Sequence, residues 1–476
     1  MPFTRKTIRK RRYPLLTDQN IIRFAEIAKL TSESIIKEQS HKDILDPIII
    51  KSLSIVEEFV AKNKLVVYGG TALNAVLPPS KQFYDKDFDL PDWDFFSDDP
   101  IRHAIEIADS ICEKTKSETF VTTAAHHGTY KVFANGLAVA DITRVDSCLL
   151  DTLRSHALIR DDILYSGPDY LRMAAYLELS RPKGQVERWE KVMKRLSLLN
   201  NAHPIKIRNF KKRDSELTAD QKHRIFTKLT DLQKDDNLVF FGPECVNIIK
   251  QSLHSRRIPI LKTDNKNMFP MLLSPSPRKT LRLVLKELRK EFEGQEIVSV
   301  CRKGRGEFLP KFNEIRFGKK GAVLCLIMGT NEGCQSIYRI PIKTTKSDTK
   351  HTITIASIET CLYLYLAIRM AKVLPVPASL LLKICDNLIR MHHHSLLKNK
   401  KPILPLPSTC VGSQITIKDM RSEKQKVIRS LFKEKNWKSN PKYFSWNIRY
   451  SGGDEKLRKT ILRSLEKRKY NKTIKH

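Results

Sequence analysis

The chain lacks the features of secreted and membrane-spanning proteins. No apolar run approaches the about 18 residues that a membrane span needs, and no secretory signal opens the sequence. The nine cysteines are scattered singly, without a Cys-x-x-Cys pair, so a structural zinc site is not expected. An odd, unclustered set of this kind predicts reduced core thiols in an intracellular protein.

Acidic residues are scarce relative to basic ones. The 52 Asp and Glu face 86 Lys and Arg, which gives a net charge of +34. The simplest partner for so much positive charge is a polyanion such as nucleic acid, and a membrane surface is the alternative. With 476 residues and 41% apolar residues, the chain is expected to be mostly globular, with two or three domains of about 150 residues each.

A strand, a Gly-Gly turn and a helix are predicted around residue 70. In "KLVVYGGTALNAVL" the run from Leu65 to Tyr68 is typical of a strand, which Gly69 and Gly70 interrupt before a helix begins. Glycines let a phosphate approach the backbone, and a helix N-terminus favours negative charge. The stretch therefore predicts an anion site, although many turns share this pattern.

Paired carboxylates follow this turn. In "PDWDFFSDDP", Asp92 and Asp94 alternate with Trp93 and Phe95. Residues i and i+2 of a strand face the same side, so we expect both carboxylates to project together. A third acid, Asp141, lies in the predicted strand "LAVADITRV".

Three carboxylates beside a phosphate cradle predict phosphoryl transfer with two metal ions. Like charges held close together raise each other's pKa unless a cation lies between them, and Mg²⁺ prefers such hard oxygen ligands. A solvated acidic loop is the alternative, because the same region contains further acids: Asp85, Asp87, Asp89, Asp98 and Asp99.

The order of these motifs resembles the nucleotidyltransferase superfamily of the DNA polymerase β type. Four blocks are similar to the poly(A) polymerase catalytic subunits of large nucleocytoplasmic DNA viruses, of the poxvirus, asfarvirus and giant-virus types: "YGGTALNAVL", "PDWDFFS", "VADITRVD" and "GPDYLRMAAYLELSRP". The similarity of motifs covers roughly residues 50 to 200. The remainder agrees in length and basicity more than in motif.

The resemblance implies a template-independent polynucleotide adenylyltransferase that adds AMP from ATP to mRNA 3′ ends. It implies Mg²⁺ or Mn²⁺ held by Asp92, Asp94 and Asp141 as catalytic residues. Many superfamily members have Ser after the first glycine, whereas this chain has Gly70. The residues expected to hold the nucleotide are Gly69, Gly70 and Thr71, with Arg172, Arg188, Lys191 and Lys194 as basic candidates.

The resemblance also sets expectations for partners and location. RNA and ATP are expected to bind, no membrane is, and either a homodimer or a viral processivity subunit would complete the assembly. The expected location is the virion and the viral factory in the host cytoplasm. Two alternatives stay open: a terminal transferase that adds UMP or CMP, and a catalytically silent RNA-binding or scaffold protein.

A second, degenerate copy of the motifs is predicted after Asn237. "LVFFGPECVNII" from Leu238 aligns with "LVVYGGTALNAV" from Leu65, and "GAVLCL" from Gly321 aligns with "GLAVAD" from Gly136. In this alignment Pro243 replaces Gly70, and apolar residues replace the three acids. Those residues are Phe269, Met271 and Leu326.

The expected fold is α/β (α+β), with a polymerase β-like nucleotidyltransferase domain, a degenerate second domain and flanking helices. The predicted divisions are a basic arm at 1–17, a catalytic domain at 18–232, the degenerate domain at 233–400 and a basic C-terminal region at 401–476. That last region interleaves Lys and Arg with aromatics that either stack on RNA bases or pack into the core. The aromatics are Trp437, Tyr443, Phe444, Trp446 and Tyr450.

Overall fold

The computed structural model describes most of the chain between residues 17 and 447. The described ranges are 17–84, 89–207, 217–233, 238–253, 269–305, 308–330, 333–343, 350–374, 376–397, 406–431 and 445–447. Residues 1–16 of the predicted basic arm lie outside these ranges, as do residues 448–476 and all of the C-terminal aromatics except Trp446. No helix in the described part of the chain is long and apolar enough to cross a membrane.

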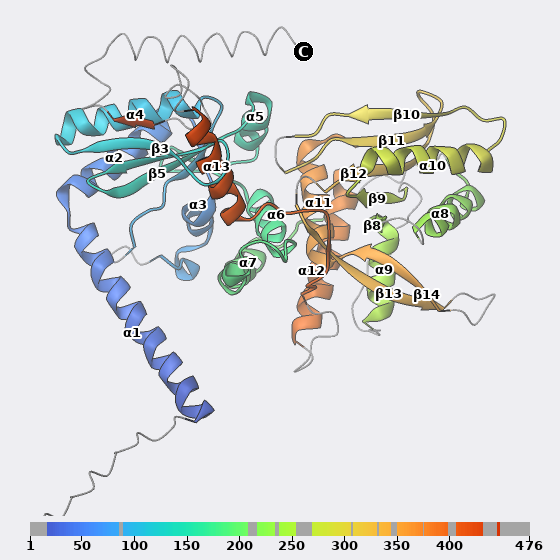
Figure 1. Ribbon diagram of the computed structural model, residues 1–476, viewed down its shortest axis with the longest axis horizontal. Helices are drawn as coiled ribbons and strands as arrows, with labels where there is room; N and C mark the ends of the chain where they lie inside the picture. The colour runs from blue at the N-terminus through green and yellow to red at the C-terminus, as the bar shows by residue number, and fades with distance from the viewer. Residues whose placement is uncertain are drawn as a thin grey trace, which may run out of the picture.

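The first sheet has eight strands in the order β16-β3-β4-β5-β2-β1-β7-β6. Its strands are β1 (Val66–Val67), β2 (Asp94–Ser97), β3 (Thr119–Thr123), β4 (Thr129–Ala134), β5 (Leu137–Arg144), β6 (Leu158–Arg160), β7 (Ile163–Tyr165) and β16 (Ser445–Asn447). The accompanying helices are α1 (Asp18–Ile44), α2 (Pro47–Lys62), α3 (Gly69–Val76), α4 (Pro100–Thr115), α5 (Ser147–Ser155), α6 (Pro168–Leu179) and α7 (Trp189–Ala202), with short 3-10 turns at Pro79–Lys81 and Val186–Arg188. Helices α2 and α4 lie beside this sheet (Figure 1).

The second sheet also has eight strands, in the order β10-β11-β12-β9-β8-β14-β13-β15. Its strands are β8 (Val239–Phe240), β9 (Met271–Ser274), β10 (Ile297–Arg302), β11 (Phe312–Phe317), β12 (Val323–Gly329), β13 (Gln335–Lys343), β14 (Lys350–Ala356) and β15 (Cys410–Val411). The helices of this half are α8 (Ala219–Gln233), α9 (Pro243–Ser252), α10 (Pro277–Glu291), α11 (Ile358–Ala371) and α12 (Ala378–Leu397), and α13 (Ile417–Leu431) follows.

The two sheets repeat one another over seven consecutive strands, as the sequence alignment predicts, and differ in the edge strands β16 and β15. The run β3-β4-β5-β2-β1-β7-β6 corresponds to β10-β11-β12-β9-β8-β14-β13. The registers agree as well: Val66 lies opposite Phe96 in the first sheet, and Val239 lies opposite Leu273 in the second. The same apolar spacing thus builds the same strand–helix framework twice, each half with its own central strands buried.

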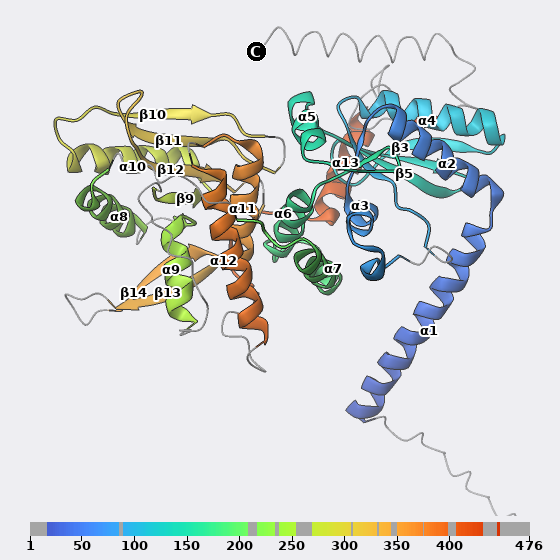
Figure 2. The same cartoon turned by 180° about the vertical axis from the view of Figure 1, so that it is seen from behind.

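Helices α6 and α11, which follow the equivalent strands β7 and β14, pack against each other between the sheets (Figure 2). Asp169 at the start of α6 forms an ion pair with Arg369 of α11 at 2.6 Å. Ser180, just past the end of α6, donates a hydrogen bond to Gln335 of β13 at 2.9 Å. Apolar and polar contacts therefore join the two halves of the molecule.

The predicted boundary between residues 232 and 233 stays a prediction, but the contacts of α8 bear on it. This helix packs on α10, and its Ile225 and Leu229 are fully buried in the core shared with the second sheet. The Gln233 side chain also accepts a hydrogen bond from the backbone N–H of Thr354 in β14 at 2.9 Å. By its contacts α8 thus belongs with the second sheet.

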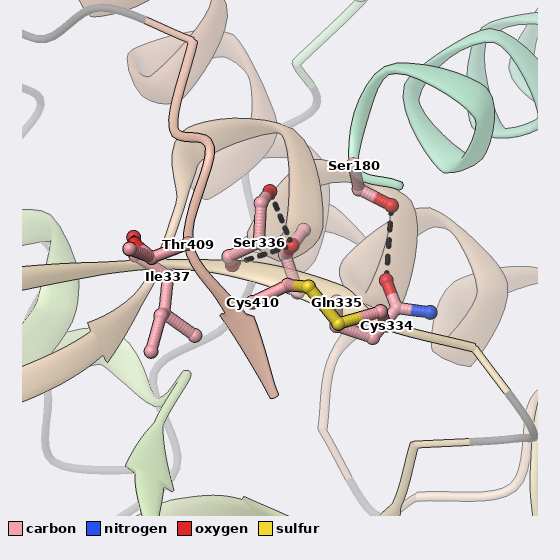
Figure 3. The surroundings of a disulfide bond; sticks show 8 residues. Ser180, Cys334, Gln335, Ser336, Ile337, Thr409 and Cys410 are labelled. Carbon is pink, nitrogen blue, oxygen red and sulfur yellow. Dashed lines mark hydrogen bonds between the residues drawn. A yellow bond between two sulfur atoms is a disulfide. The ribbon is translucent and has the colours of Figure 1, made fainter. Parts of the chain in front are cut away.

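The expectation that all cysteines are reduced is wrong. Cys334 and Cys410 form a disulfide across 76 residues, with their Cα atoms 5.3 Å apart (Figure 3). The antiparallel pairing of β13 with β15, in which Ser336 lies opposite Cys410, brings the two sulfurs together. A pairing between such distant segments leaves no motif in the sequence, so the spacing of the cysteines could not indicate it.

The C-terminal segment connects both sheets. After β15 has joined the second sheet, α13 leads to β16, which pairs with β3 at the edge of the first. Trp446 of β16 is 1% exposed and donates a hydrogen bond from its indole N–H to Asp109 at 2.9 Å. For this aromatic, packing in the core is confirmed and base stacking is not available.

Candidate functional site

The structure brings two of the predicted acids together on neighbouring strands. Strands β2 and β5 are parallel, and Asp94 lies directly opposite Asp141. Both side chains are partly buried. The ladder holds these positions firmly, because Asp141 N–H also donates to the Trp93 carbonyl at 3.0 Å and the Asp94 carbonyl accepts from Tyr68 N–H at 2.8 Å.

Asp92 reaches the same place by a different route from the one predicted. The strand begins at Asp94, so Asp92 is not a strand residue and the alternation argument does not place it. Instead, the chain turns before the strand, and Asp94 N–H donates to the Asp92 carbonyl at 2.9 Å. The Asp92 side chain is exposed, yet its charge acts on both Asp94 and Asp141.

The burial and the mutual repulsion of these carboxylates favour a bound cation. Burial, followed by the charges of Asp92 and Asp141, raises the pKa of Asp94 to about 8. Burial also raises the pKa of Asp141, while Lys131 opposes that rise. The Lys131 ammonium contacts Asp141 directly from the opposite position on β4, and this residue was not singled out in the sequence. Carboxylates that crowd one another in this way are typical of sites for divalent cations.

No group of three His, Cys, Asp or Glu side chains in the described ranges is already drawn together as a set of metal ligands. In this structure Asp141 is paired with Lys131 instead. The donor set itself, three carboxylates whose charges act on one another, nevertheless fits a hard divalent ion.

The Gly-Gly turn lies immediately beside the acids. Gly69 has a φ of +72°, and a Cβ on it would lie 2.5 Å from Asp94 Oδ2. Both the backbone conformation and this close approach require glycine. Helix α3 begins at Gly69, so the first turn of the helix, with its N–H groups that lack intrahelical partners, lies beside Asp94.

Gly70 lies under a different pair of side chains. A Cβ on Gly70 would lie 2.2 Å from the Tyr84 hydroxyl and 3.1 Å from Arg195 Nη1. The Arg195 guanidinium stacks on the neighbouring Phe83 ring, 4.5 Å from its centroid. Glycine here leaves room for an aromatic hydroxyl and a guanidinium over the first turn of α3.

Thr71 is not free to bind a phosphate in this structure. Its hydroxyl donates to the Asp92 carbonyl at 2.7 Å and accepts from the Asp92 N–H at 3.0 Å. These two bonds to Asp92 compete with the predicted contact between Thr71 and the triphosphate.

Of the basic residues expected to hold the nucleotide, Arg188 and Lys191 lie near the acids. Burial, with Arg195 and Arg188 adding to the effect, lowers the pKa of Lys191, while the Asp92 charge acts in the opposite sense. The positive charge of Arg188 also acts on Asp94. Arg188, Lys191 and Arg195 therefore form a basic cluster near the acids. Arg195 was not among the residues predicted from the sequence, although the spacing of 188, 191 and 195 is that of one helix face and would have indicated it.

The structure contradicts the assignment of Arg172. Its side chain is 1% exposed, and its guanidinium donates to Asp169 Oδ1 and Asn200 Oδ1, each at 2.7 Å, and to the carbonyl of His203. A guanidinium whose donors are satisfied inside the protein cannot reach a nucleotide. It instead ties α6 to α7.

Lys194 is also placed away from the acids. Its side chain is 73% exposed and pairs with Glu190 one turn earlier on α7, at 2.8 Å. The charges that act on it are those of Glu190 and Glu33, and none of the three acids is among them. The prediction that it holds the nucleotide has no support in this geometry.

The second sheet holds apolar residues at the equivalent places. Met271 lies opposite Leu326 on the parallel strands β9 and β12, in the register that pairs Asp94 with Asp141. Both are fully buried, and Phe269, two residues before Met271, is 6% exposed. Apolar side chains cannot ligate a metal ion, so among the described residues only the first of these two equivalent positions carries acids.

Comparisons with known proteins agree with this division. Residues 54–185, which include the Gly-Gly turn and all three acids, match the family described as poly(A) polymerase catalytic subunit. The chain is 28% identical to a putative poly(A) polymerase catalytic subunit of African swine fever virus over 162 residues. This alignment covers 33% of this chain and 34% of that protein. It is 26% identical over 319 residues to the putative subunit of Acanthamoeba polyphaga mimivirus, covering 60% of this chain and 52% of that one.

These alignments span between about a third and about a half of the length of the curated relatives. The likeness in structure is broader: the crystal structure of the Megavirus polyadenylate synthase superposes with a TM-score of 0.73 at 18% identity, over 96% of this chain and 91% of that one. The chain is therefore similar to the poly(A) polymerase catalytic subunits of large DNA viruses in the sequence around its first sheet, and to a viral polyadenylate synthase in nearly its whole fold.

Proposed function

We propose that this chain is a template-independent polynucleotide adenylyltransferase that adds AMP from ATP to the 3′ ends of mRNA. The observation that carries the proposal is the placement of Asp94 opposite Asp141, with Asp92 alongside, next to the glycine turn that opens α3. Carboxylates beside an N-terminal helix turn suit the transfer of a nucleotidyl group from a triphosphate.

Each part of the site has a separate role in this proposal. Asp92, Asp94 and Asp141 would hold Mg²⁺ or Mn²⁺, which supplies charge neutralisation for the triphosphate and lowers the pKa of the attacking hydroxyl. Gly69 and Gly70 leave room for Asp94, Tyr84 and Arg195 around the first turn of α3, where the triphosphate would meet the backbone N–H groups. The basic side chains that would contact the triphosphate are those of the cluster near the acids: Arg188, Lys191 and Arg195.

The partners follow from charge and from the relatives. A net charge of +34 suits an RNA backbone, whose phosphates release counterions when Lys and Arg neutralise them. The relatives are catalytic subunits of viral enzymes, which favours a viral setting in the virion and the host cytoplasm. Assembly as a homodimer, or with a viral processivity subunit, belongs to the same proposal.

An extension assay tests this function. Purified full chain is incubated with an RNA that ends in oligo(A), with one of the four nucleoside triphosphates at a time, and with Mg²⁺ or Mn²⁺. The proposal expects extension with ATP that needs the divalent ion. Preferred extension with UTP or CTP would indicate another terminal transferase. RNA binding without any extension would leave an RNA-binding or scaffold protein.

A further inference from the structure

Thr71 makes an unusual double contact with the backbone of Asp92. Its hydroxyl donates to the Asp92 carbonyl at 2.7 Å and accepts from the Asp92 N–H at 3.0 Å. A single side chain, 21 positions away in the sequence, thus satisfies both backbone groups of one acid. The contact joins the first turn of α3 to the segment that leads into β2.

Asp92 needs such a contact more than the other two acids do. Asp94 and Asp141 lie on paired strands, and the ladder sets where their side chains begin. Asp92 precedes the strand and is exposed, so no strand ladder holds its backbone. Besides Thr71, the local bond from Asp94 N–H to its carbonyl is the described backbone contact that restrains it.

The second half of the molecule offers a natural comparison. Gly242 occupies the place of Gly69 and directly precedes the equivalent helix α9, so Glu244 stands where Thr71 stands. In the same half Phe269 stands where Asp92 stands, and it is 6% exposed. The hydroxyl and the acid are thus both present in the first half and both absent from the second, although the framework is otherwise repeated.

We propose that Thr71 is a positioning residue that holds Asp92 in place for a divalent cation, and not a ligand of the triphosphate. The proposal rests on the function proposed above in so far as it takes Asp92 to be a metal ligand. Its mechanism is local: the hydroxyl fixes the backbone of an acid that lies outside the sheet, which lowers the cost of bringing that carboxylate to the ion.

Binding of Mn²⁺ to the full chain, without nucleotide or RNA, tests this proposal directly. Three variants of Thr71 separate the effect of its hydroxyl from that of its side-chain shape. Thr71→Val keeps the branched shape, and Thr71→Ser keeps the hydroxyl. Thr71→Ala replaces the valine variant if that variant does not fold. Thr152→Val is the matched control, because the Thr152 hydroxyl bonds within its own helix, to the Cys148 carbonyl at 2.9 Å, and to no other group in the described ranges. The Mn²⁺ binding that is lost in Asp92→Asn is the binding that belongs to this site.

We expect Thr71→Val to weaken Mn²⁺ binding by about 10- to 100-fold, the usual effect of removing a group that supports a metal ligand. Thr71→Ser and Thr152→Val should bind Mn²⁺ as the wild type does. In the Asp92→Asn background, Thr71→Val should have no further effect, because its action passes through Asp92. In extension assays, Thr71→Val should lower kcat and leave the KM for ATP nearly unchanged.

Other outcomes would overturn the proposal. Unchanged Mn²⁺ binding with a raised KM for ATP would make Thr71 a triphosphate ligand. A loss of Mn²⁺ binding in Thr71→Ser equal to that in Thr71→Val would show that the hydroxyl is not the cause. A wild type that binds no Mn²⁺ would leave nothing for Thr71 to position. Failure of the proposed function looks different: Mn²⁺ binding would follow the expected pattern while the wild type extended no RNA.

Discussion

Asp94 and Asp141 lie directly opposite each other on adjacent parallel strands, and burial together with the neighbouring acids raises the pKa of Asp94 to about 8. The fold therefore holds like charges together at a cost to its own stability. In the equivalent register of the second sheet, Met271 and Leu326 pack with no such cost. This contrast between the two halves leads to the predictions that follow.

Asp94 should make the folded protein less stable as the pH rises. Its pKa moves from an ordinary 3.8 to about 8, so between these values the folded state keeps a proton that the unfolded state has lost. The free energy of unfolding should therefore fall as the pH rises through this window. Thermal melts of Asp94→Asn should lie above those of the wild type at pH 8 and close to them at pH 4.

The control for this pH effect is Asp151→Asn, since Asp151 is 70% exposed and pairs only with Arg154 among the contacts described. Its melting temperature should follow that of the wild type across the same range. Parallel pH profiles for Asp94→Asn and the wild type would mean that Asp94 is ionised at neutral pH in the folded protein.

Gly69→Ala should lower activity as well as stability. Gly69 and Gly136 both have positive φ values, +72° and +83°, so alanine at either one costs about 1–2 kcal/mol of backbone strain. Only at Gly69 would the new Cβ meet Asp94, at 2.5 Å, whereas nothing lies within 4 Å at Gly136. Melting temperatures should fall in both variants and kcat in Gly69→Ala alone. Equal activities would show that the contact with Asp94 has no consequence.

Arg195→Ala and Lys194→Ala should differ sharply although the two residues are neighbours. Arg195 lies over Gly70, where the triphosphate is proposed to bind, while Lys194 pairs with Glu190 on an exposed face. Loss of one charge-assisted contact costs about 1.5–3 kcal/mol, so the KM for ATP should rise about 10- to 100-fold in Arg195→Ala. Lys194→Ala should keep the wild-type KM. The same KM in both variants would remove Arg195 from the nucleotide site.

Met271→Asp should destabilise the protein without creating a second active site. Met271 is fully buried, and a carboxylate there would be an unpaired buried charge. We expect a drop in melting temperature of many degrees and no gain in extension, with Met271→Leu as the volume-matched control. A stable Met271→Asp variant that bound ATP or Mn²⁺ in its second half would contradict the interpretation of that half as degenerate.

Much of the fold could be predicted because its cause is local and repeated. The same apolar strand, glycine turn and amphipathic helix occur twice at matching spacing, and each copy forms the same sheet. Asp94 and Asp141 do lie on strands, as predicted, because apolar residues flank both of them in the sequence, whereas Asp92 precedes the strand and the predicted alternation does not place it. The disulfide between Cys334 and Cys410 was missed, because it depends on a strand pairing across 76 residues.

The contacts around the acids could not be predicted for similar reasons. A simple two-residue hairpin turn at Asn135 would place Lys131 opposite Ala140, but a β-bulge between Val132 and Phe133 moves it opposite Asp141. Arg172 could not be told from a surface residue by periodicity. Apart from Asp169 on its own helix, its partners lie on α7 and beyond, and only the packed structure brings them to it.

The most direct test of the account is the rate of AMP addition by variants of the three acids, measured beside their affinity for RNA. Asp92→Asn, Asp94→Asn and Asp141→Asn should each extend oligo(A)-ended RNA on the order of a thousandfold more slowly, since each removes a proposed metal ligand. Their RNA affinity should stay near that of the wild type, and Asp151→Asn should extend normally. Near-normal extension by Asp94→Asn or Asp141→Asn would contradict the assignment of this site.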